Sequence, residues 1–274
     1  VREFTRCWWD AKAFKPEGVV SLGDDGLWEK FLKRGTEKCI PFPAGFSVLN
    51  KAMNGGMVAG ELTVIGALTS VGKSTMVSNL VCGYVEESTK TVGCVFLEAD
   101  IGETIENLVS VSSKTRITNI AHENRDYVAY KKTYDELTNT KALHLLDHRG
   151  SLDSEELFAK IQFMIKGMDC DIIIIDPLQA GVKSNENTAI DDFMDRCLKM
   201  IKNTEVAMVL VSHMRKPPHG RGPHDVDEYD LKGSSSINQI ATNTILLSRD
   251  KKEEDEYARN CTQVQLVKCR RTGR

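Results

Sequence analysis

From Glu61 onward, short apolar runs alternate with segments whose apolar residues recur at helical spacing. The apolar runs predict buried strands, and their alternation with helices is typical of a mainly parallel α/β sheet. The pattern predicts helices at 76–85, 102–111, 122–137, 153–167 and 189–202. It predicts strands at 62–65, 92–97, 142–146, 171–175, 206–211, 244–247 and 264–268.

The start of the chain has a different pattern. Residues 1–22 have no sustained period and include an extended segment at 15–18, which predicts a linker. Residues 23–36 predict a short helix with one apolar face, which packs either on its own domain or on a neighbouring subunit. That face consists of Leu27, Trp28, Phe31 and Leu32. Residues 37–274 then predict one α/β domain.

Composition narrows the class of protein. The 274 residues include 36 Lys and Arg against 39 Asp and Glu, a net charge of −3, which excludes a uniformly basic nucleic-acid-binding protein but allows a local basic patch. No apolar run approaches the roughly 20 residues of a membrane span, and no signal-peptide pattern is present. Eight dispersed cysteines without a CxxC pair argue against a zinc ribbon or a disulfide framework. Because the chain starts without Met and ends in a basic run, we expect a fragment of a longer protein.

The strongest chemical signal is the segment 67–75, between a predicted strand and a predicted helix. It matches a P-loop, in which backbone N–H groups and a helix N-terminus hold phosphate oxygens. Lys73 would reach the β and γ phosphates, and the Ser74 hydroxyl would bind Mg²⁺. Ala67 stands where the common pattern has Gly, and Gly66 lies one residue too early to replace it. The predicted nucleotide-binding residues are Ala67, Thr69, Ser70, Val71, Gly72, Lys73, Ser74 and Thr75.

Two carboxylates follow predicted strands. Asp176 ends an all-apolar strand and suits the Walker B role of holding Mg²⁺ near the P-loop. Glu98 follows a strand that we expect beside the P-loop strand, where a carboxylate can deprotonate an attacking water. The alternative is that Glu98 caps the next helix, a role for which Asp100 and Glu103 are closer candidates.

His213 ends another predicted strand, at the edge where open α/β sheets bind ligands. It is a candidate sensor of the γ-phosphate, and a structural histidine is the alternative. The following segment, 214–224, carries three basic residues, three prolines and two histidines, and its first acidic successor is Asp225. This segment predicts either a contact with nucleic-acid phosphates that does not depend on sequence or a solvated loop.

Together these residues resemble the RecA-like motor domain of hexameric replicative helicases of the DnaB type. The resemblance is greatest to the primase-helicases of short-tailed phages and extends more distantly to the mitochondrial helicase Twinkle. It covers about residues 15–274. It rests on the linker, the P-loop, Glu98, the Asp176 strand and the segments 212–214, 231–234 and 268–270.

The resemblance implies a RecA-like P-loop NTPase fold and a role for each matching residue. It implies that Glu98 is the catalytic base, that Asp176 is the Walker B acid, and that His213 joins the nucleotide site to a DNA-binding loop. In that loop, the residues that would hold single-stranded DNA are Arg215, Lys216, His219 and Arg221. Gln239 matches a polar residue of the same relay, and Arg249 and Arg270, which follow the last two strands, match arginines that reach a neighbour's nucleotide.

We therefore expect an ATP-driven DNA helicase motor that uses Mg²⁺ with ATP, dTTP or another NTP. It would move on single-stranded DNA as a ring of six or seven copies, with a primase domain or a DNA polymerase as further partners. It would work without a membrane, in the cytoplasm of the host if a phage encodes it, rather than in mitochondria. The alternative is an ATP-switched assembly protein on DNA, such as a recombinase-like filament or a helicase loader, that does not unwind. A small-molecule kinase would need an acceptor site and a lid, for which the sequence has no signal.

Overall fold

The computed structural model describes residues 18–33, 38–87, 90–147, 154–182, 187–215, 220–233 and 236–273. The chain divides into two units, residues 1–38 and 39–274. In the first unit, helix α2 (Leu27–Lys33) lies within the predicted range 23–36 but begins only at Leu27. The Trp28 and Phe31 rings stack on this helix with their centroids 5.0 Å apart. Most of the predicted linker lies outside the described residues.

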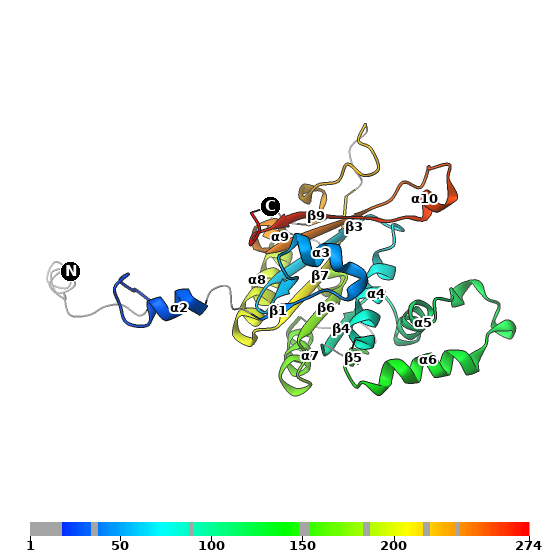
Figure 1. Cartoon of the computed structure of the whole chain (residues 1–274), viewed down its shortest axis with the longest axis horizontal. Coiled ribbons are helices and arrows are strands. Elements are labelled where there is room, and N and C mark those ends of the chain that lie inside the picture. The colour runs from blue at the N-terminus through cyan, green and yellow to red at the C-terminus, as the bar shows by residue number, and fades with distance from the viewer. Residues whose placement is uncertain are drawn as a thin grey trace. The chain divides into compact units, whose positions relative to one another are not determined.

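A seven-stranded sheet forms the centre of the second unit (Figure 1). The strand order is β5–β4–β6–β7–β3–β8–β9, and only β9 runs antiparallel to its neighbour. This arrangement confirms the predicted mainly parallel α/β sheet. The strands are β3 (Leu62–Ala67), β4 (Val92–Phe96), β5 (Leu143–Leu145), β6 (Ile172–Asp176), β7 (Ala207–His213), β8 (Asn243–Ser248) and β9 (Gln263–Cys269).

The prediction that β4 lies beside the P-loop strand β3 is wrong, because β6 and β7 separate the two. β4 pairs with β6, so that Phe96 opposes Asp176, and β3 pairs with β7, so that Ala67 opposes His213. Apolar periodicity identifies a strand, whereas the order of strands depends on how whole helices pack on the sheet. The observed order still brings the carboxyl ends of β4, β6, β7 and β3 to one edge.

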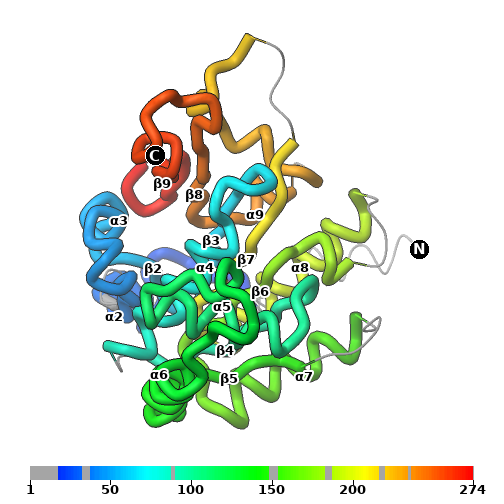
Figure 2. The backbone as a smooth tube through the Cα atoms, turned by 90° about the vertical axis from the view of Figure 1, so that its right-hand side faces the viewer, coloured from blue at the N-terminus to red at the C-terminus, as the bar shows by residue number. Residues whose placement is uncertain are grey.

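Helices cover both faces of the sheet (Figure 2). Alternate residues of each strand enter two separate cores: Ile172 and Ile174 belong to one, and Ile173 and Ile175 to the other. A parallel sheet buried on both faces requires such continuous apolar strands. The first core is covered by α3 (Ser47–Ala52), α4 (Lys73–Glu86), α5 (Ile101–Ser112) and α6 (Tyr127–Asn139), and the second by α7 (Ser154–Gly167), α8 (Asn187–Thr204) and α9 (Ser236–Ile240).

Several elements differ from the prediction. The helix predicted at 122–137 begins at Tyr127, where the Asp126 carboxylate accepts a hydrogen bond from the Ala129 N–H, and His122–Asn124 form a separate 3-10 turn. The helices α3, α9 and α10 (Glu256–Asn260) are not predicted, because each is too short to show a helical period. The same holds for the antiparallel pair β1 (Cys39–Ile40) and β2 (Met57–Val58).

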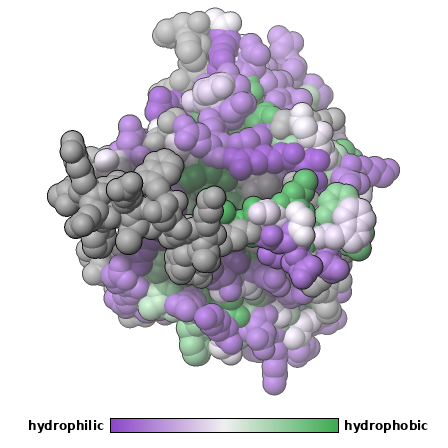
Figure 3. Space-filling view, turned by 90° about the vertical axis from the view of Figure 1, so that its left-hand side faces the viewer, coloured by the Kyte–Doolittle hydropathy of each residue, from purple (hydrophilic) through white to green (hydrophobic). Residues whose placement is uncertain are grey.

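None of the helices within the described ranges combines the length and apolar character needed to cross a bilayer. Hydrophilic side chains predominate over the coloured part of the face in Figure 3.

Candidate functional site

The turn between β3 and α4 has the backbone of a P-loop. Ser70 and Gly72 adopt positive φ angles of 61° and 102°, and Gly72 is the N-cap of α4. Left-handed residues next to a helix N-terminus expose backbone N–H groups that bind anions. The segment between β8 and β9 supports this turn, because Lys251 Nζ donates to the Thr69 carbonyl at 2.9 Å and Thr262 Oγ1 donates to the Val71 carbonyl at 2.6 Å.

Packing accounts for the departure of this P-loop from the common pattern. Ala67 lies in β3 itself, where it pairs with His213 and Leu247, so its extended backbone accommodates a methyl group. A side chain at position 66 would force its neighbours to move, because a Cβ there would lie 2.5 Å from a methyl carbon of Leu231 and 2.6 Å from one of Leu246. The residues predicted to bind phosphate therefore keep a strand-to-helix turn despite the missing glycine.

Lys73 and Asp176 meet at the carboxyl edge of the sheet. Lys73 Nζ lies 2.7 Å from Asp176 Oδ1, and the two side chains are only 13% and 11% exposed. Burial raises the pKa of Asp176, and the attraction of Lys73 opposes that rise. Next to this pair is a cavity of about 150 Å³, lined also by Ser74 and Glu98. An ammonium group beside a hydroxyl and carboxylates is a set of groups that suits a phosphate chain with Mg²⁺.

Three acidic residues near the cavity have different partners. The Asp100 carboxylate accepts a hydrogen bond from the Glu103 N–H at 2.8 Å and is the N-cap of α5. Glu98 is therefore not the cap of that helix, and it lines the cavity together with Glu103. Its side chain is 59% exposed, and its Oε1 lies 3.3 Å from His213 Nε2. The structure thus brings the proposed base and the proposed sensor together.

The segment after β7 forms a loop whose two ends are held together. Met214 forms a bridge with Leu231, and the Lys232 N–H donates to the His213 carbonyl at 2.7 Å. Arg215 is exposed, and its Nη2 donates to the Gly233 carbonyl at 3.0 Å. The predicted DNA-binding residues Lys216 and His219 lie outside the described residues.

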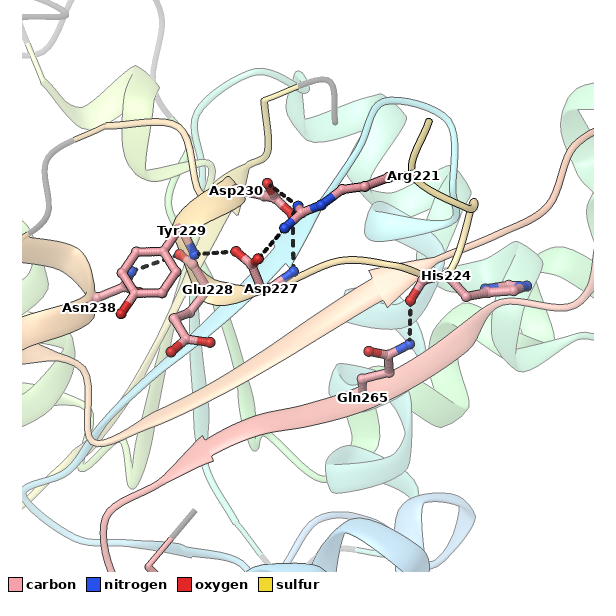
Figure 4. Close-up of polar contacts among 8 residues, drawn as sticks. All are labelled: Arg221, His224, Asp227, Glu228, Tyr229, Asp230, Asn238 and Gln265. Atoms are coloured by element: carbon pink, nitrogen blue, oxygen red, sulfur yellow. Dashed lines mark hydrogen bonds and ion pairs between the residues drawn. The ribbon is translucent and has the colours of Figure 1, made fainter. Parts of the chain in front are cut away.

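Arg221 is bound by carboxylates of its own loop (Figure 4). Its Nη1 lies 2.9 Å from both carboxylate oxygens of Asp230, and its Nη2 lies 2.5 Å from Asp227 Oδ2. The hydrogen bond to Asp227 raises the pKa of Arg221. The two acids also form a capping box around the 3-10 turn Glu228–Asp230. Thus the acidic residues that follow the basic segment fold back onto it.

The residues predicted near a neighbour's nucleotide have partners within this chain. Arg270 donates to the Gln239 carbonyl, and Arg249 donates to the Arg259 carbonyl and to the side chain of Asn260. Among the described residues, neither Arg249 nor Arg270 lines the cavity beside Lys73. The structure therefore does not bring these arginines to the chain's own site.

Gln179, Lys251 and Thr262 are not among the predicted site residues. Gln179 lies in the 3-10 turn Leu178–Gly181, just after Asp176, and its side chain bonds to the end of β7. Gln179 could have been identified from the sequence, because it is a polar residue shortly after the strand-end acid Asp176. Lys251 and Thr262 have no local signal, because their contacts with the P-loop depend on the long-range pairing of β8 and β9.

Comparisons with known proteins agree with this geometry. The chain matches the family model described as DnaB-like helicase C-terminal domain over residues 42–274. It is 27% identical over 285 residues to a DNA helicase/primase of Enterobacteria phage T3, a match that covers 97% of this chain and 48% of that protein. The chain therefore spans about half the length of that relative.

Two solved structures share the fold. One, of a DnaB-like replicative helicase and its interactions with primase, has a TM-score of 0.76 at 20% identity, over 90% of this chain and 63% of that one. The other, described as an ATPase domain, has a TM-score of 0.73 at 20% identity, over 90% of this chain and 92% of that one. These likenesses confirm the predicted RecA-like α/β fold.

Proposed function

Because the chain belongs to the family of DnaB-like helicase C-terminal domains, we propose that it is the ATP-hydrolysing motor of a replicative DNA helicase. In this proposal, ATP binds between the subunits of a ring, and its hydrolysis moves loops of the ring along one DNA strand. One observation carries the proposal. Lys73, Asp176, Glu98 and His213 meet at one edge of the sheet, on or beside one cavity.

Each of these residues has a role in hydrolysis. Lys73, now paired with Asp176, would exchange that carboxylate for the β and γ phosphates, and the P-loop N–H groups would bind the other phosphate oxygens. Asp176 and Ser74 would then hold Mg²⁺, which neutralises charge on the phosphates. Glu98 would accept the proton of the attacking water. His213, next to Glu98, would respond to the loss of the γ-phosphate.

The loop 214–233 is the proposed contact with single-stranded DNA. Arg215 is exposed at its start, and Lys216 and His219 follow it in the sequence. Phosphate contacts from such residues give affinity without reading the base sequence. Arg221 would join them by exchanging the Asp227 and Asp230 carboxylates for DNA phosphates.

Ring assembly and further partners are part of the same proposal. The stacked Trp28 and Phe31 of α2 would dock on a neighbouring subunit. Arg249 and Arg270, with Gln239, would face that neighbour's nucleotide. The T3 relative is a helicase/primase and one similar structure includes interactions with primase, which supports primase as a partner.

The test of the motor is a charge-matched pair of variants. Glu98→Gln should still bind ATP and single-stranded DNA but lower ATP hydrolysis by about 10²–10⁴-fold, the usual contribution of general base catalysis. Glu103→Gln, which changes a carboxylate lining the same cavity, should keep most of its rate. Phosphate release and displacement of a labelled strand are measured in parallel. Equal losses from the two variants would contradict the role of Glu98, and DNA-stimulated hydrolysis without strand displacement would favour the ATP-switched assembly protein.

A further inference from the structure

The side chain of Gln179 contacts both ends of the loop 214–233. Its amide nitrogen donates to Ser212 Oγ at 2.8 Å and to the Lys232 carbonyl at 2.8 Å, and its amide oxygen accepts from the His213 N–H at 3.2 Å. A glutamine amide has two N–H donors, and here both are in use. Ser212 and His213 lie just before the loop, and Lys232 lies near its last residue. One side chain therefore links the two ends of the loop.

Gln179 is also tied to the nucleotide site. It follows Asp176 by three residues, in the 3-10 turn that leaves β6. Its amide oxygen accepts a hydrogen bond from the N–H of His213, and Nε2 of the His213 ring lies 3.3 Å from Glu98 Oε1. A continuous path of contacts therefore runs from Glu98 through His213 and Gln179 to Lys232.

We propose that Gln179 is a positioning residue that couples ATP hydrolysis to the loop. It touches none of the reacting atoms. It fixes the backbone of His213 relative to the Asp176 turn, and it passes a shift of His213 to the far end of the loop through the Lys232 carbonyl. The inference rests on the proposed function, since it requires that ATP is hydrolysed at Glu98 and that the loop binds DNA.

Two variants separate the bonds of Gln179. Gln179→Met keeps the length of the side chain and removes all three hydrogen bonds. Gln179→Glu keeps an acceptor for the His213 N–H but, when ionised, loses both donated bonds. Gln265→Met is the matched control, because Gln265 Nε2 donates one bond to the His224 carbonyl of the same loop (Figure 4), and neither residue lines the cavity.

The measured quantity is kcat for ATP with saturating single-stranded DNA, divided by kcat without DNA. In Gln179→Met this ratio should fall toward one and the DNA-stimulated kcat should fall by about 10²-fold, the scale of a small misplacement of catalytic groups. The KM for ATP and the affinity for DNA should change little, a split that a general loss of folding would not give. Gln179→Glu should lose the stimulation equally but keep more of the DNA-free rate. Gln265→Met should keep the wild-type ratio.

The possible failures are distinguishable. If DNA does not stimulate hydrolysis by the wild-type chain, the proposed function falls and this inference falls with it. If the wild type is stimulated and a folded Gln179→Met variant is stimulated equally, only the inference is overturned. Thermal unfolding reports whether each variant folds, and if Gln179→Met does not, an unchanged ratio in Gln179→Glu overturns the inference on its own.

Discussion

Among single residues, Asp176 shows how the proposed nucleotide site can oppose stability. Burial raises the pKa of its carboxyl group even though Lys73 Nζ lies 2.7 Å away, so the fold disfavours the ionised form. The ionised form is the one that Mg²⁺ binding requires. Sites that need such groups commonly sacrifice some stability for function.

Asp176→Asn should therefore abolish Mg²⁺-dependent hydrolysis and raise the melting temperature of the nucleotide-free protein at pH 7. Because the folded-state pKa is raised, the folded state binds the proton more tightly than the unfolded state, and the ionised carboxylate costs stability above the folded-state pKa. This cost disappears as the pH falls through the folded-state pKa to below the ordinary value of 3.8. The advantage of the variant should shrink accordingly between pH 7 and pH 4 in thermal unfolding. A variant that melts below the wild type at pH 7 would contradict this account.

Among the elements, the loop 214–233, which is the proposed DNA contact, contains carboxylates that would compete with DNA for Arg221. Asp227 and Asp230 hold the guanidinium of Arg221 through the same donors that a phosphate would use. A phosphate that replaces them must overcome charge-assisted hydrogen bonds from two guanidinium nitrogens to two carboxylates. Arg215, which donates to the Gly233 carbonyl, has no such pair within the described part of the chain. The loss of a neighbouring carboxylate should therefore change the contribution of Arg221 to DNA binding but not that of Arg215.

Arg215→Ala should flatten the plot of log K against log salt for single-stranded DNA by about 0.7 for each phosphate that the variant no longer binds. Asp227→Asn should tighten binding, because it removes the charged partner of Arg221 Nη2, while Asp230 still holds Nη1 and an asparagine still caps the turn Glu228–Asp230. The same substitution in an Arg221→Ala background is the control, and it should give much less tightening. Titrations at several salt concentrations measure the wild type and all four variants. Equal tightening in both backgrounds would mean that Asp227 acts only through its charge and that Arg221 does not bind phosphate.

How well the sequence predicts an element depends on whether its cause is local. The run Ile172–Ile175 is apolar at every position because β6 is buried on both faces, and that cause is visible in the sequence. The position of β4 beside β6 is a long-range arrangement of the sheet, which no local pattern records. Glu98 lines the cavity even though the sequence predicts the wrong neighbour for its strand, because all the parallel strands end at the same edge.

Side-chain partners are the hardest feature to predict. Arg221 and its acids are 6 and 9 residues apart, and only the fold of the loop shows that they pair. Gln179 bonds to Ser212 and Lys232 across 33 and 53 residues. The P-loop, by contrast, is a single continuous turn, so its strand-to-helix geometry could be predicted from 67–75 alone.

For the whole molecule, the position of Arg270 is the feature that bears on assembly. It follows the antiparallel strand β9, its side chain is exposed, and it donates to the Gln239 carbonyl near the end of α9. It does not line the cavity beside Lys73 in the described part of this chain. A rigid guanidinium aimed at a neighbour's γ-phosphate is most effective in a site sealed from water, and a subunit interface supplies such a site.

Arg270→Ala should bind nucleotide normally and lose about 10³-fold or more in turnover, the scale of an arginine finger. Specific activity of the wild type should rise with protein concentration as rings assemble. Arg271→Ala is the contrasting variant, because Arg271 donates to the Met53 and Gly56 carbonyls and should act on stability rather than on turnover per folded subunit.

The decisive measurement mixes Arg270→Ala with Glu98→Gln subunits, each nearly inactive alone. Some interfaces of a mixed ring pair an intact Glu98 with an intact Arg270, so part of the ATPase activity should return. Mixtures that stay inactive while the wild type hydrolyses ATP at the same specific rate at every concentration would mean that Arg270 does not act on a neighbour's nucleotide and would remove the need for a ring.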